Sequence, residues 1–137
     1  MLRPDVSLDT LHARQEGKLP GQYGFKVTAF GEGSLSAEMA VLPWMLAPNG
    51  FLHAASVILL ADTACGYATY AHLPPGAKGF TTIELKSNFL GTAVSGVIRA
   101  EAVGEHIGRT TQVWSADVFN GEGRRMAMFR CTQMVLV

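Results

Sequence analysis

The sequence has no excess of charge of either sign. Its 11 Lys and Arg residues balance 11 Asp and Glu residues over 137 positions, and the basic residues are scattered along the chain. Binding to DNA or RNA requires a basic stripe or patch. We therefore expect no nucleic-acid partner.

Cysteine is also scarce. Cys65 lies in an apolar segment and Cys131 lies near the C-terminus. A chain of this length with 48% hydrophobic residues can bury a core without disulfides. We interpret both as small buried apolar residues of a protein in a reducing compartment.

Long hydrophobic runs are absent. The longest strongly apolar run, Val57 to Ala61, ends at Asp62 and is far shorter than the ~20 residues of a membrane span. The first seven residues carry charge and proline where a signal peptide needs apolar residues. We expect a cytoplasmic protein with no membrane partner, folded as a single domain over residues 1–137.

The N-terminal part of the chain is predicted to contain a short helix and two strands. Ser7 to Glu16 has polar N-cap candidates in Ser7 and Asp9, and residues 1–20 form this helix and its lead-in. Two alternating segments follow, joined by a glycine-containing, hairpin-like turn. They are Tyr23 to Phe30 and Ser34 to Ala40.

A nearly all-apolar segment from His53 to His72 predicts one long buried helix, because small and aliphatic residues occur on every side of a 3.6-residue period. Asp62 is the one formally charged side chain in it. A carboxylate taken out of water is costly unless it is paired, and its pKa usually rises. Asp62 is a candidate general base or nucleophile. The alternative is a structural carboxylate, satisfied by Ser and Thr neighbours or a helix N-terminus.

Four strands are predicted after this helix, as an antiparallel meander. They cover Phe80 to Leu90, Ser95 to Glu105, Arg109 to Asn120 and Arg124 to Val137. In the first strand Ile83, Leu85 and Phe89 alternate with polar residues, so one face is dry. The stretch from Gly104 to Gly108 is interpreted as a turn.

One long apolar helix needs a sheet that curls around it, as twisted antiparallel strands do. The predicted fold class is therefore α+β with the hotdog architecture. A long central helix is wrapped by a curved antiparallel sheet of about six strands, preceded by a short N-terminal helix. We place Trp114 and Val118 on the outer face of the sheet, where a second subunit covers them. A homodimer or homotetramer is expected.

The segment from Pro48 to Ala55, with Asp62 nine residues after His53, resembles the motif of hotdog-fold acyl-CoA thioesterases of the phenylacetate-pathway (PaaI-like) type. The strand from Phe80 to Leu90 is similar to the second signature of that family. The resemblance spans about Ala47 to Val137. It implies hydrolysis of an acyl-CoA thioester, with aryl-acyl-CoA as one candidate, to a free acid and CoA, without metal or cofactor.

The resemblance also implies roles for single residues. Asp62 falls on the position of the catalytic carboxylate, which acts as nucleophile on the carbonyl or as base toward water. Ala54 falls where a helix-start N–H faces the thioester oxygen; such an N–H is unpaired, and the helix dipole favours negative charge there. His53 and Gly50 belong to the same motif and are candidate substrate-binding residues. For His53 the first interpretation is a structural helix-start residue whose ring hydrogen-bonds the backbone, and the second is a group that orients the carbonyl.

Two positions differ from the family pattern or leave a choice. Six residues before His53, where many relatives carry Asn or Gln, this chain has Ala47, and Asn49 is the nearest amide that can replace it. Thr82 corresponds best to the family Ser or Thr that positions the attacking water. Strand alternation instead places Thr81 on the apolar face, so both threonines stay candidates.

Sites of this family lie across a dimer interface. The resemblance therefore implies that Asp62 and Thr82 of one subunit face Asn49, His53 and Ala54 of the other. Surface basic residues are expected to meet the phosphates of CoA. The candidates are Arg109, Arg124, Arg125 and Lys86.

Two competing functions stay open. The loss of the amide at Ala47 gives weight to a non-catalytic dimer that binds acyl thioesters. A hotdog hydratase or dehydratase is a weaker alternative, because its histidine is typically followed within a few residues by proline, and none follows His53 so closely. The four histidines show no ligand spacing with one another or with either cysteine, so no metal site is expected.

Overall fold

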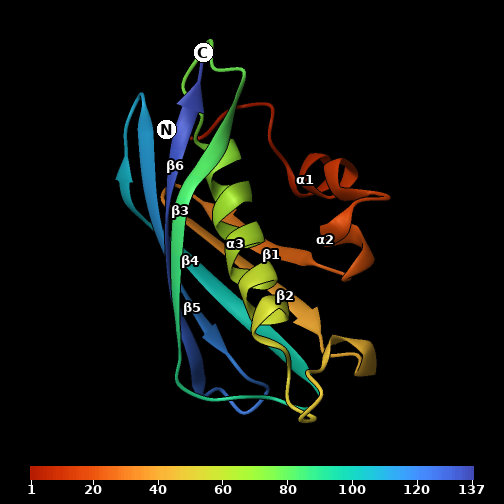
Figure 1. Cartoon of the computed structure of the whole chain (residues 1–137). Coiled ribbons are helices and arrows are strands. Elements are labelled where there is room, and N and C mark those ends of the chain that lie inside the picture. The colour runs from red at the N-terminus through yellow and green to blue at the C-terminus, as the bar shows by residue number, and fades with distance from the viewer.

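Six strands and one long helix form the body of the molecule (Figure 1). The structure is a computed structural model that describes all of residues 1–137. In chain order the elements are α1 (Leu8–Gln15), α2 (Leu19–Gln22), β1 (Lys26–Gly31), β2 (Ser34–Ala40), the 3-10 helix η1 (Pro43–Met45), α3 (Ala54–Ala71), β3 (Gly79–Phe89), β4 (Val97–Ile107), β5 (Thr111–Phe119) and β6 (Arg125–Leu136).

The long apolar helix predicted from the sequence is α3. His53 is its N-cap, and the His53 Nδ1 atom accepts a hydrogen bond of 2.9 Å from the Ala55 N–H. Eleven of its 18 residues are buried, and small side chains let the helix approach the sheet closely. Cys65 on α3 and Cys131 on β6 are both buried free thiols. No helix of the chain is long and apolar enough to cross a membrane.

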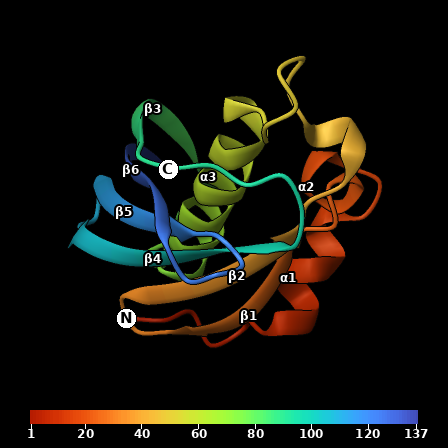
Figure 2. The ribbon, with the colours of Figure 1, turned by 90° about the horizontal axis from the view of Figure 1, so that it is seen from below.

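The sheet forms an arc with α3 on its concave side, which confirms the predicted hotdog architecture (Figure 2). The strand order is β1-β2-β4-β5-β6-β3, and all pairs are antiparallel. The predicted meander in sequence order is wrong for one strand: β3 pairs with β6 and not with β4. The connection after β3 instead carries the chain back to the middle of the sheet, where β4 pairs with β2. One edge of β3 consequently has no neighbour.

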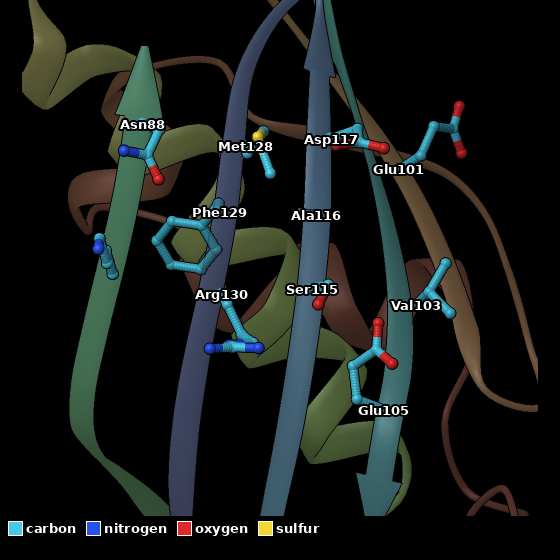
Figure 3. Close-up of a pocket in the computed structure, with 11 residues that line it drawn as sticks. Asn88, Glu101, Val103, Glu105, Ser115, Ala116, Asp117, Met128, Phe129 and Arg130 are labelled. Atoms are coloured by element: carbon cyan, nitrogen blue, oxygen red, sulfur yellow. The ribbon is translucent and has the colours of Figure 1, made fainter.

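The two faces of the sheet differ from the prediction at Trp114 and Val118. Both are completely buried on the concave face, because the inward positions of β5 are the even-numbered ones. The outer face instead carries polar and mixed side chains around a groove of about 420 Å³ (Figure 3). The groove is lined by residues that include Glu101, Val103, Glu105, Ser115, Asp117, Met128 and Arg130.

The stretch from Gly104 to Gly108 was predicted as a turn, and this is wrong for most of it. Strand β4 continues through Ile107, with a bulge between Gly104 and His106. A Cβ atom on Gly104 would lie 2.7 Å from Ile107 Cδ1, so a larger residue here would require the Ile107 side chain to move. A glycine-rich stretch does not by itself distinguish a bulge from a turn.

Helix α1 is fixed against the β1 edge of the arc (Figure 2). Ser7 and Thr10 form its capping box, which confirms Ser7 as the N-cap. The His12 Nε2 atom accepts a 2.9 Å hydrogen bond from the Val27 N–H. Gln15 Nε2 donates a 2.7 Å hydrogen bond to the Phe25 carbonyl. Side chains on α1 are therefore held by a rigid element.

Candidate active site

Asp62 lies in the middle of α3 with its carboxylate largely buried. Its Oδ1 atom is inaccessible to solvent and has no hydrogen-bond partner. Burial raises the pKa of Asp62 above its ordinary value, because removal from water disfavours the charged form. The structural alternative, a carboxylate satisfied by neighbouring donors, does not describe this oxygen. An unpartnered carboxylate of raised pKa is suited to accept a proton.

A small pocket of about 210 Å³ opens beside Asp62. It is lined by Arg14, Pro20, Asp62, Thr63, Gly66, Tyr67, Tyr70, Phe80 and Thr82. A β-bulge between Thr82 and Glu84 shifts the alternation of β3 by one residue. Thr82 therefore pairs with the buried Gln133, whereas Thr81 pairs with Met134 and lines no part of this pocket. A bulge is not visible in a period-two pattern, which explains why the sequence left both threonines open.

Gln133 fixes the hydroxyl of Thr82. Thr82 Oγ1 donates a 2.7 Å hydrogen bond to Gln133 Oε1, and Gln133 Nε2 donates to Cys131 Sγ at 3.4 Å. With its hydrogen used in this way, the Thr82 oxygen can only accept a hydrogen bond from a molecule in the pocket. Gln133 was not among the site residues predicted from the sequence. The sequence feature that could have indicated it is a polar residue at an inward position of a strand, between the apolar residues Cys131 and Val135.

The start of α3 offers free hydrogen-bond donors. The N–H of Ala54 donates to no protein atom, whereas the N–H of Ala55 is bonded to His53 Nδ1. Because Nδ1 accepts that bond, a neutral His53 carries its proton on Nε2. Ala54 and His53 therefore present two N–H groups at a helix N-terminus, where the dipole favours negative charge.

A second pocket, of about 340 Å³, contains these donors. Its lining includes Ala47, Asn49, His53 and Ala54, with Phe89 from the end of β3. Asn49 Oδ1 accepts a 3.1 Å hydrogen bond from the Phe51 N–H, which leaves the amide NH₂ group available. Gly50 is not part of the lining; its φ of 89° forms the turn that returns the chain to α3.

One chain does not bring these two groups of residues together. His53 and Asp62 are nine residues apart, which on an α-helix means opposite faces and about 13 Å along the axis. Asp62 and Thr82 line the pocket at the start of β3. Asn49, His53 and Ala54 line the pocket at its end. A single chain therefore holds the candidate site residues in two separate pockets.

The candidate phosphate-binding arginines lie at two ends of the molecule. Arg124 lies in the β5–β6 turn and Arg125 is the first residue of β6, at the end of the sheet where α3 begins (Figure 1). Arg125 is 3.4 Å from Asp117 in an ion pair. Arg109 lies at the opposite end, in a pocket that also contains His72. Lys86 lies in the groove on the outer face of the sheet.

Comparison with known proteins identifies the family. The model of the Thioesterase superfamily matches residues 49–127. The proofreading thioesterase EntH of Klebsiella pneumoniae is 30% identical over 132 residues, which is 96% of each protein. The 1,4-dihydroxy-2-naphthoyl-CoA hydrolase of Escherichia coli is 28% identical over 131 residues, also 96% of each. The crystal structure of a mutant thioesterase from Pseudomonas aeruginosa has a TM-score of 0.92 and 30% identity, covering 98% of this chain and 97% of that one.

The chain is therefore a thioester hydrolase of the hotdog class. It belongs to the Thioesterase superfamily, as the motif around His53 and Asp62 predicted. The family match begins at Asn49 and ends at Ala127, so α1 and α2 lie outside it.

Proposed function

We propose that this protein hydrolyses an acyl-CoA thioester to a free acid and CoA. The observation that carries the proposal is a pair of pockets: one contains the half-buried carboxylate of Asp62, whose Oδ1 atom has no partner, and the other contains free N–H groups at the start of α3. The first supplies a base and the second an oxyanion site, which are the two requirements of acyl transfer to water. The E. coli relative is named as the hydrolase of a CoA thioester.

In the proposed reaction Asp62 acts as a general base toward water. The Thr82 oxygen accepts one hydrogen bond from the water molecule, and the carboxylate accepts the other proton. The water oxygen then bonds to the thioester carbon, whose carbonyl oxygen becomes negatively charged. When the C–S bond breaks, the proton held by Asp62 passes to the CoA sulfur. The arrangement favours the base role over direct attack, because Thr82 is available only as an acceptor.

The oxyanion is proposed to lie between the Ala54 N–H and His53 Nε2–H of a second subunit. Asn49 is proposed to contact the thioester through its NH₂ group; its place in the same pocket supports this. Arg124 and Arg125 lie at this end of the molecule and are the nearer candidates for the CoA phosphates.

We propose that a homodimer joins these two pockets through the free edge of β3. This strand exposes apolar residues, including Ile83 (53% exposed) and Phe89 (45%), which is a liability for an unpaired edge. Antiparallel pairing of two β3 strands places the start of one beside the end of the other. Because Thr82 lies at the start and Phe89 at the end, the pairing brings the Asp62 pocket to the partner's Ala54 pocket. A tetramer requires a further contact.

The acyl group is proposed to be aromatic. Tyr67, Tyr70 and Phe80 form walls of the Asp62 pocket, and Gly66 forms part of its lining. Flat aromatic walls suit a planar ring. Because Arg14 and Pro20 line the same pocket, residues 1–137 are proposed to act as one domain, with α1 and α2 as part of the acyl site.

A non-catalytic acyl-thioester-binding protein is the second candidate, and Ala47 favours it. This side chain lies in the Ala54 pocket but supplies no amide. If Asn49 has taken over the amide's task, Asn49→Ala lowers kcat and Ala47→Gln restores part of it. Binding without turnover in the unmodified protein would favour the second candidate.

Thiol release from a panel of aryl- and fatty-acyl-CoA esters tests the proposed function. The unmodified protein is compared with Asp62→Asn, which keeps the shape and removes the charge. Turnover of aryl esters that falls by about 10²- to 10⁴-fold in the variant, with fold and oligomer intact, supports the proposal. Equal turnover by both proteins would refute the role of Asp62.

A further inference from the structure

The Asp62 pocket contains a cation for which the proposed mechanism has no use. Arg14, from α1, lines the pocket together with Asp62. The two side chains form no ion pair with each other, and Arg14 has no carboxylate partner elsewhere. Arg3, Arg99 and Arg125 are each paired with an acidic side chain, whereas Arg109, Arg124 and Arg130, like Arg14, are not.

Arg14 is held in place by an aromatic ring. Its guanidinium carbon lies 3.8 Å from the centroid of Tyr70, within the range of a cation–π contact. Stacking leaves the edge N–H groups of the guanidinium free to donate hydrogen bonds. The helix that carries Arg14 is itself fixed through Gln15, whose Oε1 accepts a 2.8 Å hydrogen bond from the Tyr67 hydroxyl. The cation is therefore pre-positioned.

The position of Arg14 along the pocket defines what it can contact. Tyr70 is eight residues after Asp62, so it lies about 12 Å farther along α3. Gly66 lies between them on the same side, and Phe80 closes the wall above it, 3.4 Å from where a Gly66 Cβ would be. An acyl group that has its thioester carbonyl at Asp62 and extends along this pocket approaches Arg14. Arg14 is also close enough to affect Tyr67. Burial raises the pKa of Tyr67 to about 12, and the positive charge of Arg14 acts in the opposite direction.

We infer that Arg14 is a specificity-determining residue that binds an acidic oxygen, phenolic or carboxylate, at the far end of the acyl group. The inference rests on the proposed function, because it assumes that the acyl group enters the Asp62 pocket. A guanidinium gives strong, directional hydrogen bonds to such oxygens. An acyl group that lacks an acidic oxygen leaves the Arg14 guanidinium without a hydrogen-bond acceptor. The substrate class is therefore an aryl thioester with an acidic ring substituent.

The test compares three esters: benzoyl-CoA, 4-hydroxybenzoyl-CoA and 4-carboxybenzoyl-CoA. The quantity measured is kcat/KM for each substituted ester divided by that for benzoyl-CoA. In Arg14→Leu this ratio falls by about tenfold to a hundredfold for at least one substituted ester, which identifies the acidic group that is bound. Arg14→Lys keeps the charge and retains part of the preference.

Arg3→Leu is the matched control. Arg3 also lies over the Tyr70 ring, at 4.4 Å, but it is paired with Asp5 and lines a different pocket. Its loss leaves the ratio intact. An Arg14→Leu variant that hydrolyses all three esters with the ratio of the unmodified protein would overturn the inference and leave the proposed function standing. An equal loss for all three esters would overturn it too, since it would assign Arg14 to the CoA part of the substrate.

A binding measurement separates this inference from the proposed reaction. Titration calorimetry of the same esters with Asp62→Asn and Asp62→Asn/Arg14→Leu gives the Kd ratio without turnover. If the unmodified protein hydrolyses no ester, the proposed function fails, and the Kd ratio still decides the role of Arg14. A tenfold or larger weakening confined to a substituted ester supports the inference, and an unchanged ratio refutes it.

Discussion

Replacing Ala54 by proline removes one backbone N–H and leaves the neighbouring groups in place. Ala54 is the first residue of α3, where the N–H has no partner within the helix. Proline is favoured at this position because no helical hydrogen bond is lost. The residue before a proline must be extended, and His53 already is, with φ −65° and ψ 139°. The Ala54 side chain is exposed, so the ring meets no packed neighbour.

We expect Ala54→Pro to lower activity strongly while changing stability little. The free energy of unfolding changes by no more than about 1 kcal/mol, since the backbone is compatible with proline. In contrast, kcat for an aryl-CoA ester falls by about 10²- to 10³-fold, or about 2.7–4 kcal/mol, the usual effect of losing one oxyanion donor. KM changes little, because the N–H is used mainly in the transition state.

Thiol-release kinetics and thermal unfolding of Ala54→Pro check both expectations. Ala54→Gly is the control, because it changes the side chain but keeps the N–H. An Ala54→Pro protein that folds normally and retains most of its kcat would refute the assignment of the Ala54 N–H as an oxyanion donor. Loss of activity in Ala54→Gly as well would attribute the effect to the side chain and not to the N–H.

Three further predictions concern Asp62, Gln133 and Gly66. Burial raises the pKa of Asp62, so the folded protein tolerates the protonated side chain better than the charged one. The free energy of unfolding is therefore highest at low pH with respect to this group, and it falls as the pH rises through the raised pKa. Asp62→Asn is therefore more stable than the unmodified protein at pH 7 in urea unfolding, and this advantage disappears below pH 3.8, the ordinary value; a variant less stable at pH 7 would contradict this. Gln133→Leu releases the Thr82 hydroxyl and lowers kcat by about tenfold with little change in KM; an additive loss in the double variant with Thr82→Val would show that the two act separately. Gly66→Val places carbon atoms against Phe80 and lowers kcat/KM for benzoyl-CoA by about tenfold or more relative to acetyl-CoA, and equal effects on both esters would argue against an acyl pocket here.

Much of the fold follows from local patterns in the sequence. The apolar segment around Asp62 has the composition of a helix buried on all sides, and α3 extends from Ala54 to Ala71 as expected. The hairpins and the N-cap at Ser7 follow from turn and capping residues. The place of β3 beside β6 could not be read in this way, because strand pairing depends on contacts distant in sequence. Trp114 and Val118 were assigned to the wrong face because alternation gives two faces without saying which is inward.

The candidate site could also be predicted only in part. Asp62, His53 and Ala54 were found because their spacing is a property of one helix. Thr82 could not be separated from Thr81, because the bulge that reverses the alternation depends on pairing with Gln133. Arg14 gave no signal, since a single arginine on a short amphipathic helix usually faces solvent. Its position over Tyr70 arises from packing between segments 56 residues apart.

The central claim is that each site combines Asp62 of one subunit with Ala54 of another, and mixing two inactive variants tests it most directly. Asp62→Asn and Ala54→Pro are unfolded together, refolded in equal amounts and assayed for thiol release, with each variant refolded alone as the control. Random pairing produces sites with both residues intact, so the mixture recovers about a quarter of the activity of the unmodified protein. No recovery, with mixed oligomers demonstrated by differently tagged subunits, would contradict a site shared between subunits.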